Sequence, residues 1–278
     1  MNIMLKSKIL VIVVLAIFAF QSCEKDPLTQ PAATNAPSLP PIESFYLSLD
    51  SWAEIDTTGF NEDLGKSNGP TYTNVWYAAT NMVVWNGFII AASAIPVATF
   101  AEAFNHEAVY NPTDDTFEWN YTHREGLRNF RAKLVGEILS NEEVSWKMFI
   151  SLVGQYEDAL FYEGITSRDN IDANWTLYGD PVDPKPTLFI EYSKNDNGES
   201  QIKYTNILEA TPEFGHFIES RNTNGTDYNR FFDVYRGKDD FLQIKLIEPG
   251  KGGAVKNVKF FGDDEYHCWD DSYQDTEC

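Results

Sequence analysis

The sequence predicts a mainly β fold of the α+β class. It is expected to be an antiparallel meander of about eleven strands, packed as a curved half-barrel or barrel around a buried N-terminal apolar helix. The helix is predicted from Val75 to Phe104, because no charged residue occurs between Lys66 and Glu102. A run that is apolar on nearly every side is typical of a helix buried all round. The sheet is predicted over residues 117–261, where apolar residues recur with a period of two.

The start of the chain has the pattern of an export signal. Lys6 and Lys8 form a positive start, and the apolar run Ile9 to Phe20 that follows has a length that suits cleavage rather than a membrane span. Gln21-Ser22-Cys23 resembles the lipobox of bacterial lipoproteins, in which the cysteine is acylated and becomes the new N-terminus. We therefore expect a lipoprotein signal peptide over residues 1–22 and lipid attachment at Cys23. An ordinary cleaved signal with a free Cys23 is the alternative.

Residues 23–43 are predicted to form the lipidated N-terminus and a tether. Glu24-Lys25-Asp26 is similar to the short tag of lipoproteins that are moved to the outer face of the outer membrane. Pro27 to Pro41 is rich in Pro, Ala, Ser and Thr and cannot bury a core, which is typical of an extended tether. We expect an outer-membrane lipoprotein that faces the cell exterior, is held to the membrane by its lipid, and carries a single β-rich domain over residues 44–278.

The apolar helix is expected over residues 75–105. Pro96 cannot sit inside a helix without removing a hydrogen bond, so it should kink the run or split it into Val75–Ala94 and Val97–Asn105. The run is also long enough to span a membrane. Asn81 and Asn86 weaken that interpretation, and no aromatic and basic flanks frame the run. A core helix is therefore favoured over a transmembrane helix.

Turn-rich links separate the strands predicted after the helix. Asn197-Gly198, for example, is typical of a tight hairpin. The predicted strands are Phe117–Tyr121, Phe130–Ile138, Val144–Leu152, Ala159–Thr166, Asn174–Tyr178, Thr187–Tyr192, Gln201–Leu208, Gly215–Ser220, Asn229–Arg236, Phe241–Glu248 and Ala254–Phe261. Their order and spacing favour one meander, in which each strand pairs with the next.

Residues 262–278 are predicted to form an acidic tail closed by a disulfide bond. Besides Cys23 the chain has only Cys268 and Cys278, and two nearby cysteines in an exported protein most simply pair. Oxygen ligands that suit Ca²⁺ are dense in this tail, and the weak candidates to hold the ion are Asp263, Asp264, Asp270 and Asp271. The favoured interpretation is a solvated acidic loop without a metal, and we expect no cofactor.

No catalytic motif occurs in the sequence, which has no G-x-S-x-G, H-E-x-x-H, Walker A or G-x-G-x-x-G pattern. The formal net charge of −21 makes nucleic-acid binding unfavourable. Aromatic residues make up 14% of the chain and could line a cavity for an apolar ligand or a sugar. The weak candidates for ligand binding are Trp146, Phe161, Trp175 and Tyr204. Packing of these side chains in the core is the favoured alternative.

Two stretches resemble a family of Bacteroidetes-type outer-membrane and surface lipoproteins. They are Trp175-Thr176-Leu177-Tyr178 with the following Pro-Lys-Pro, and the ending from Phe261, FGDDEYHCWDDSYQDTEC. The resemblance covers most of the mature chain and implies a location at the cell surface, but no activity. In architecture, the predicted fold is also similar to the half-barrel of periplasmic lipoprotein carriers and to lipocalin-style barrels.

These observations lead to three hypotheses about function. The first is a lipid-anchored cell-envelope protein with a non-catalytic binding or interaction role, since no catalytic constellation is visible. The second is a half-barrel carrier of an apolar ligand or lipid, which the strand count and the aromatic faces suggest. The third and weakest is a glycan-active surface enzyme, which would need two carboxylates facing each other. The partners considered are therefore an apolar ligand, a glycan or an envelope protein.

Overall fold

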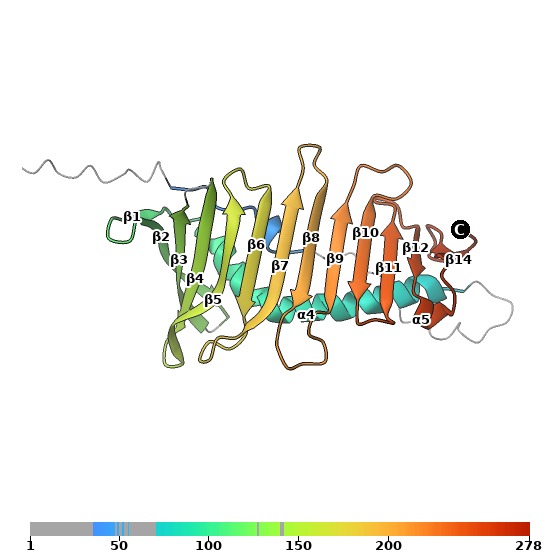
Figure 1. The fold of residues 1–278 in the computed structure, drawn as a ribbon, viewed down its shortest axis with the longest axis horizontal. Coiled ribbons are helices and arrows are strands. Elements are labelled where there is room, and N and C mark those ends of the chain that lie inside the picture. Colours follow the sequence, from blue (N-terminus) through green and yellow to red (C-terminus); the bar gives the residue numbers. More distant parts are fainter. Residues whose placement is uncertain are drawn as a thin grey trace, which may run out of the picture.

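A computed structural model describes residues 36–47, 49, 52, 55, 71–126, 128–139 and 142–278. The predicted signal peptide, Cys23 and the first part of the tether lie outside these residues, so the expectations about them stay predictions. Within the described part, one antiparallel sheet carries one long helix across one of its faces, as Figure 1 shows.

The sheet has fourteen strands, and each strand pairs antiparallel with the next one in the chain. The order runs from β1 to β14 without a crossover, and these two end strands are edges, so the sheet is open (Figure 1). The strands are β1 Val109–Asn111, β2 Thr116–Glu125, β3 Arg128–Ile138, β4 Glu143–Leu152, β5 Tyr156–Ser167, β6 Asp172–Tyr178, β7 Pro186–Lys194, β8 Ser200–Asn206, β9 Phe217–Asn222, β10 Arg230–Tyr235, β11 Phe241–Leu246, β12 Gly253–Lys256, β13 His267–Trp269 and β14 Asp275–Thr276.

The predicted meander is confirmed, because the predicted strands correspond to β2 through β12. The sheet extends further than expected, with β1 before them and β13 and β14 after them. The last predicted strand, Ala254–Phe261, is wrong in its second half, since β12 ends at Lys256 and the short helix α5 (Val258–Phe261) follows. Asn257 starts this helix by accepting a hydrogen bond from the Phe260 N–H at 2.9 Å. The open edges also exclude the closed-barrel alternative.

The long helix α4, Thr73–Ala103, lies across the strands on one face of the sheet (Figure 1). Its buried side chains include Val75, Met82 and Ile89, all fully buried. The prediction of a helix buried all round is wrong, because the sheet covers only one side of α4. On the opposite side, 68% of Val84 is exposed to solvent.

Pro96 lies inside α4, which continues across it, so the predicted split of the helix is wrong. The ribbon bends toward its C-terminal end, in agreement with the predicted kink (Figure 1). Pro96 itself is buried. The hydroxyl of Thr99 donates to the carbonyl oxygens of Ile95 and Pro96 at 2.8 and 3.0 Å. These bonds and the packing on the sheet stabilise the helix where proline removes a backbone bond.

The C-terminal tail holds the N-terminus of α4. The backbone N–H groups of Thr73 and Asn74 donate to the two carboxylate oxygens of Asp275, each at 3.0 Å. A carboxylate here satisfies free N–H groups of the first turn and interacts favourably with the helix dipole. Asp275 lies in the loop closed by the predicted Cys268–Cys278 disulfide, which is confirmed, with Cα atoms 5.1 Å apart. The stapled tail is therefore a cap for the helix.

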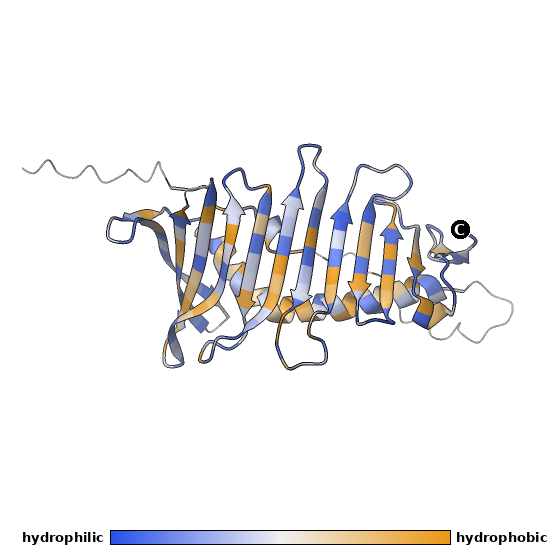
Figure 2. Ribbon diagram, viewed as in Figure 1, coloured by the Kyte–Doolittle hydropathy of each residue, from blue (hydrophilic) through white to orange (hydrophobic). Residues whose placement is uncertain are grey.

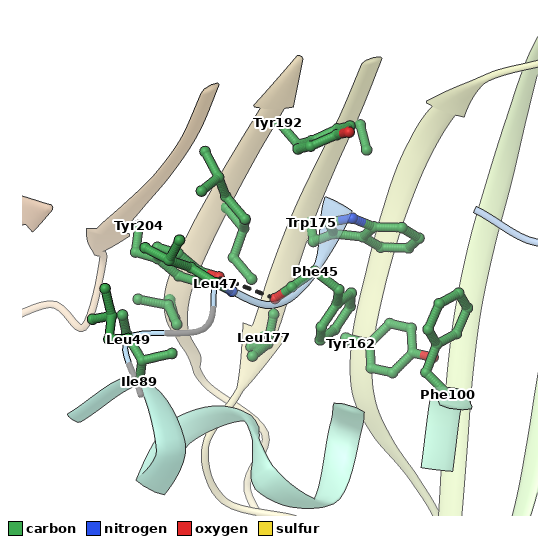
Figure 3. Packing of buried hydrophobic residues seen from close by; sticks show 14 of the residues in the cluster. Phe45, Leu47, Leu49, Ile89, Phe100, Tyr162, Trp175, Leu177, Tyr192 and Tyr204 are labelled. Carbon is green, nitrogen blue, oxygen red and sulfur yellow. Dashed lines mark hydrogen bonds between the residues drawn. The ribbon is translucent and has the colours of Figure 1, made fainter. Parts of the chain in front are cut away.

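The N-terminal segment packs between α4 and the sheet (Figure 3). The ring of Phe45, just after the 3₁₀ turn η3 (Ile42–Ser44), lies 4.7 Å from the ring of Tyr162 and 5.1 Å from that of Trp175, between centroids. The Leu47 N–H donates to the Tyr204 hydroxyl at 2.7 Å, and that hydroxyl donates to the Phe45 carbonyl at 3.3 Å. The core of the domain therefore includes residues that directly follow the predicted tether.

Part of the predicted tether also packs on the domain. Pro37 and Pro40 are buried. The Asn170 side chain, in the turn between β5 and β6, donates to the Ser38 hydroxyl at 3.0 Å. From residue 36 onward, the Pro-rich stretch therefore belongs to the fold.

Candidate functional site

The four aromatic residues predicted weakly to bind a ligand lie in the core instead. Trp146, Trp175 and Tyr204 are fully buried, and Phe161 is only 7% exposed. None of them lines any of five surface cavities among the described residues. The period of two correctly identified the inward face of each strand. The inward face packs against α4 and the N-terminal segment. The four rings therefore contact other side chains of the core and leave no space for a ligand beside them.

The four tail aspartates do not converge on a common point, and no group of three metal-ligating side chains occurs among the described residues. Asp263 contacts His267 at 3.0 Å, and Asp264 pairs with Lys256 at 2.8 Å. Asp270 accepts backbone N–H bonds within its own turn. Asp271 accepts the N–H groups of residues 251 and 252 at 3.1 and 3.0 Å. Each carboxylate therefore stabilises a local turn or ion pair.

The carboxylates near the cavities do not form a pair of the kind that a glycosidase needs. A cavity of about 410 Å³ has Glu157 and Asp158 in its wall, but these residues are consecutive on one strand. Glu157 pairs with Arg131 at 2.9 Å, and Asp158 accepts a hydrogen bond from the Ser151 hydroxyl at 3.2 Å. Each of the other four cavities has one carboxylate among its described lining residues. Two facing carboxylates are therefore not found at these cavities.

The most unusual surface among the described residues is the side of α4 that points away from the sheet. We call it the outer face of α4. All its side chains are exposed and uncharged, and they are Thr80, Val83, Val84, Gly87, Phe88, Ile90, Ala91 and Ala94. Most of them recur at intervals of three and four residues, so they form one stripe about 21 Å long. Figure 2 shows that hydrophobic residues continue along the helix where it crosses the strands.

A small hollow extends the outer face toward the sheet. Its volume is about 190 Å³, and Val84, Trp85 and Phe88 form its helical wall. His216 and Arg236, beside the ends of β9 and β10, belong to the opposite wall. Because the helical wall is apolar, the hollow would accept an apolar group from a molecule that covers the outer face.

Polar bonds hold this part of α4 rigidly on the sheet. Arg236 donates to the side chain of Asn81 on the helix and pairs with Asp240 at 2.8 Å. Burial opposes ionisation of Asp240, but hydrogen bonds from Arg236, Asn257 and Lys259 outweigh it and lower the pKa of this carboxyl. Arg236 and Asp240 therefore neutralise each other beside the helix. The outer face is therefore an uncharged surface on a helix that is bonded to the sheet.

The length and composition of α4 would also suit a helix that crosses a membrane, a property that core helices of other folds share. Here one side of α4 is buried against the sheet, and its first turn is bonded to Asp275. Sequence reasoning missed the outer face because it took the lack of charge to mean burial. The sequence did contain a signal for this surface. A helix that packs on a single sheet needs one apolar stripe, whereas this run is apolar on two opposite sides.

Comparison of the chain with family models, with curated proteins and with solved structures finds no match in any of the three. Any argument about function must therefore start from the structure of the described residues.

Proposed function

We propose that this protein is a non-catalytic interaction protein of the cell envelope, anchored by a lipid on Cys23, and that it binds another protein through the outer face of α4. The observation that supports the proposal is the exposed apolar stripe from Thr80 to Ala94. Exposed apolar stripes of this length on a rigid element are rare on monomers and mark interaction sites. The location at the outer membrane, facing the exterior, rests on the sequence pattern of the first residues.

The partner that fits this face is an uncharged apolar surface of a protein rather than a lipid surface. Helices that lie on membranes carry Lys or Arg beside their apolar face, and this chain has none between Lys66 and Glu102. The net charge of −21 also repels anionic headgroups. Gly87, Ala91 and Ala94 are small and exposed along this face, and small residues at such spacing allow a second helix to approach closely.

Photo-crosslinking in the cells that produce the protein tests this proposal. A photoreactive residue at Val84 is compared with one at Asn174, which is exposed on a strand of the sheet. We expect a discrete protein adduct from position 84 and none from position 174. A mass of two chains would identify a second copy as the partner, and any other mass a different protein. Adducts with lipid alone, or equal labelling at both positions, would contradict the proposal.

A charge on the outer face should disrupt the contact without disturbing the fold. With the photoreactive residue moved to Phe88, Val84→Glu should reduce the adduct at least tenfold, because the carboxylate would lose its hydration in the interface. Val182→Glu is the matched control, since Val182 is 78% exposed in a loop. Both substitutions should change the free energy of unfolding by less than about 0.5 kcal/mol. An adduct that survives Val84→Glu would contradict the assigned face.

A carrier of an apolar ligand is the second candidate, and the hollow beside Phe88 is the observation that favours it. Its volume of about 190 Å³ is below the roughly 300–1,000 Å³ of typical ligand sites. Trp85 and Ile89 are buried against the sheet. We therefore place the carrier second. Native mass spectrometry of gently purified protein checks it, since a carrier should retain a lipid and an interaction protein should not.

A further inference from the structure

A second feature, independent of α4, lies where β9 and β11 end and β10 begins. A cavity of about 780 Å³ opens there between the loop after β9 and the turn after β11. Its described wall includes Asn222, Thr223, Arg230, Phe232 and Glu248. The volume falls within the range of small-molecule binding sites, roughly 300–1,000 Å³. Pro249 and Gly250 also belong to the described wall, which therefore combines polar and apolar groups.

Arg230 is the distinctive residue of this cavity, because it is half-buried and lacks an anionic partner. Its guanidinium lies over the Phe232 ring, 5.2 Å from the centroid, and one Nη donates to the Asn222 side-chain oxygen. Its Nε is buried and has no hydrogen-bond partner among the described residues. Burial lowers the pKa of this guanidinium, and the charge of Glu248, which makes no direct ion pair with it, opposes that shift only in part.

The other two half-buried arginines among the described residues do have an anionic partner. Arg221 and Arg236 pair with carboxylates at 2.7 and 2.8 Å. The chain has twice as many acidic as basic residues, 42 against 21, so acidic partners are abundant. A half-buried arginine without a carboxylate among the described residues is therefore an exception. A buried charge is stable only when it is paired, and a bound anion would supply the missing partner.

The neighbours of Arg230 add hydrogen-bonding groups and rigidity. With its oxygen bonded to Arg230, Asn222 has its side-chain NH₂ free of partners among the described residues. Asn229 fixes the cavity wall, since its side chain donates to the Glu248 carbonyl at 2.7 Å and accepts from the Glu248 N–H at 2.8 Å. The site is thus preorganised by a side chain that a ligand need not touch.

Glu248 limits the kind of anion that fits. Its carboxylate is exposed at the cavity wall, and its charge acts on Arg230 without a direct ion pair among the described contacts. A dianion such as phosphate would be repelled by this carboxylate. A ligand with one carboxylate and several hydroxyls would avoid that cost, because a hydroxyl can donate to Glu248 while the carboxylate pairs with Arg230.

We propose that this cavity binds the carboxylate of a uronate-type acidic sugar. Arg230 holds the carboxylate, and the Asn222 amide and the Glu248 carboxylate bind hydroxyl groups. The buried ring of Phe232 supports the guanidinium of Arg230 from beneath. The ligand is either a free sugar acid or the end of an acidic glycan chain.

Calorimetric titration of the purified protein tests this site with four probes: glucuronate, digalacturonate, glucose and inorganic phosphate. We expect saturable binding of the two acids, and at least tenfold weaker binding of glucose and phosphate. Tighter binding of digalacturonate than of glucuronate would identify a glycan end, and equal binding a free sugar acid. The proposal is overturned if neither acid binds saturably, or if glucose binds as well as glucuronate.

Two variants and a control assign the binding to the cavity. Arg230→Gln should weaken glucuronate binding at least tenfold, while Arg131→Gln, which removes an exposed arginine elsewhere, should leave it unchanged. Glu248→Gln should tighten phosphate binding at least fivefold, because it removes the repelling carboxylate. The substitution removes no described side-chain bond of Glu248. It therefore tests the site even if Arg230→Gln does not fold. Unchanged phosphate affinity in Glu248→Gln would overturn the proposal. Val84→Glu changes the outer face of α4 and leaves this cavity intact, so it should not affect glucuronate binding. Failure of the sugar-binding proposal is therefore distinguishable from failure of the proposed protein contact.

Discussion

At the scale of single residues, two buried tyrosines have opposite surroundings. Tyr204 accepts the Leu47 N–H and donates to the Phe45 carbonyl, whereas the Tyr162 hydroxyl is buried without a hydrogen-bond partner among the described residues. Tyr204→Phe should therefore lower the free energy of unfolding by about 1–3 kcal/mol, because it leaves a buried N–H without an acceptor. Tyr162→Phe keeps the ring and removes an unpaired polar group, so it should be neutral or slightly stabilising.

Urea unfolding of the two variants and the parent measures the difference directly. The two substitutions remove the same atom from fully buried rings, so each is the control for the other. Equal losses of stability would show that the hydrogen bonds of Tyr204 do not account for the effect.

The same residues show what sequence reasoning can assign at this scale. Alternation placed Trp146, Trp175 and Tyr204 on the inward face, and all three are fully buried. Alternation carries no information about whether that face is covered by a helix or by a ligand, so the weak ligand-binding assignment had no physical support. Arg230 stands at the start of a predicted strand, but nothing in its local sequence distinguishes it from paired arginines such as Arg221. Its lack of a carboxylate depends on contacts between distant strands.

At the scale of elements, the C-terminal tail and α4 should be energetically coupled. Asp275 caps the first turn of α4, and the Cys268–Cys278 bond closes the loop that carries it. Asp275→Ala should lower the free energy of unfolding by about 1–2 kcal/mol. Cys278→Ser should lower it by about 2–4 kcal/mol. If the disulfide positions the cap, the double variant should lose less than the sum of the two, since the cap is already weakened without the bond.

A double-mutant cycle, with unfolding followed by circular dichroism in urea, checks this coupling. Asp196→Ala is a suitable control, because Asp196 is exposed in the turn between β7 and β8, and its effect should add to that of Cys278→Ser. Strict additivity for Asp275→Ala as well would mean that the cap forms without the disulfide.

Element prediction succeeded where a pattern was long and failed where it was short or one-sided. The sequence of each strand from β2 to β12 has several alternating apolar and polar positions or is flanked by turn residues. Strands β1, β13 and β14 have three, three and two residues, and so few positions define no period. For α4 the apolar pattern predicted a helix correctly but could not tell which of two apolar sides would face solvent. That side, the outer face, is the surface on which the proposed function rests.

At the scale of the whole molecule, the open sheet buries tyrosine hydroxyls along much of its length. Tyr121, Tyr162 and Tyr204 lie on β2, β5 and β8, and all are buried. Burial raises the pKa of each of these phenols above the ordinary value of 10.0. In the unfolded chain they titrate near their ordinary pKa, so above about pH 10 unfolding releases protons that the folded protein retains. Stability should therefore be unaffected by these groups below pH 10 and fall above it.

The loss should approach about 1.4 kcal/mol per pH unit for each tyrosine that stays neutral in the fold. Urea unfolding at pH 8, 9.5, 10.5 and 11 measures the slope. Lysines titrate in the same range, so the slope of the parent alone does not identify the tyrosines. Tyr162→Phe removes one of the three groups without removing a described hydrogen bond, so its slope above pH 10 should be shallower by about that amount. An identical slope in the variant would mean that the alkaline loss arises elsewhere, for example from ion pairs such as Lys256–Asp264 at the sheet surface.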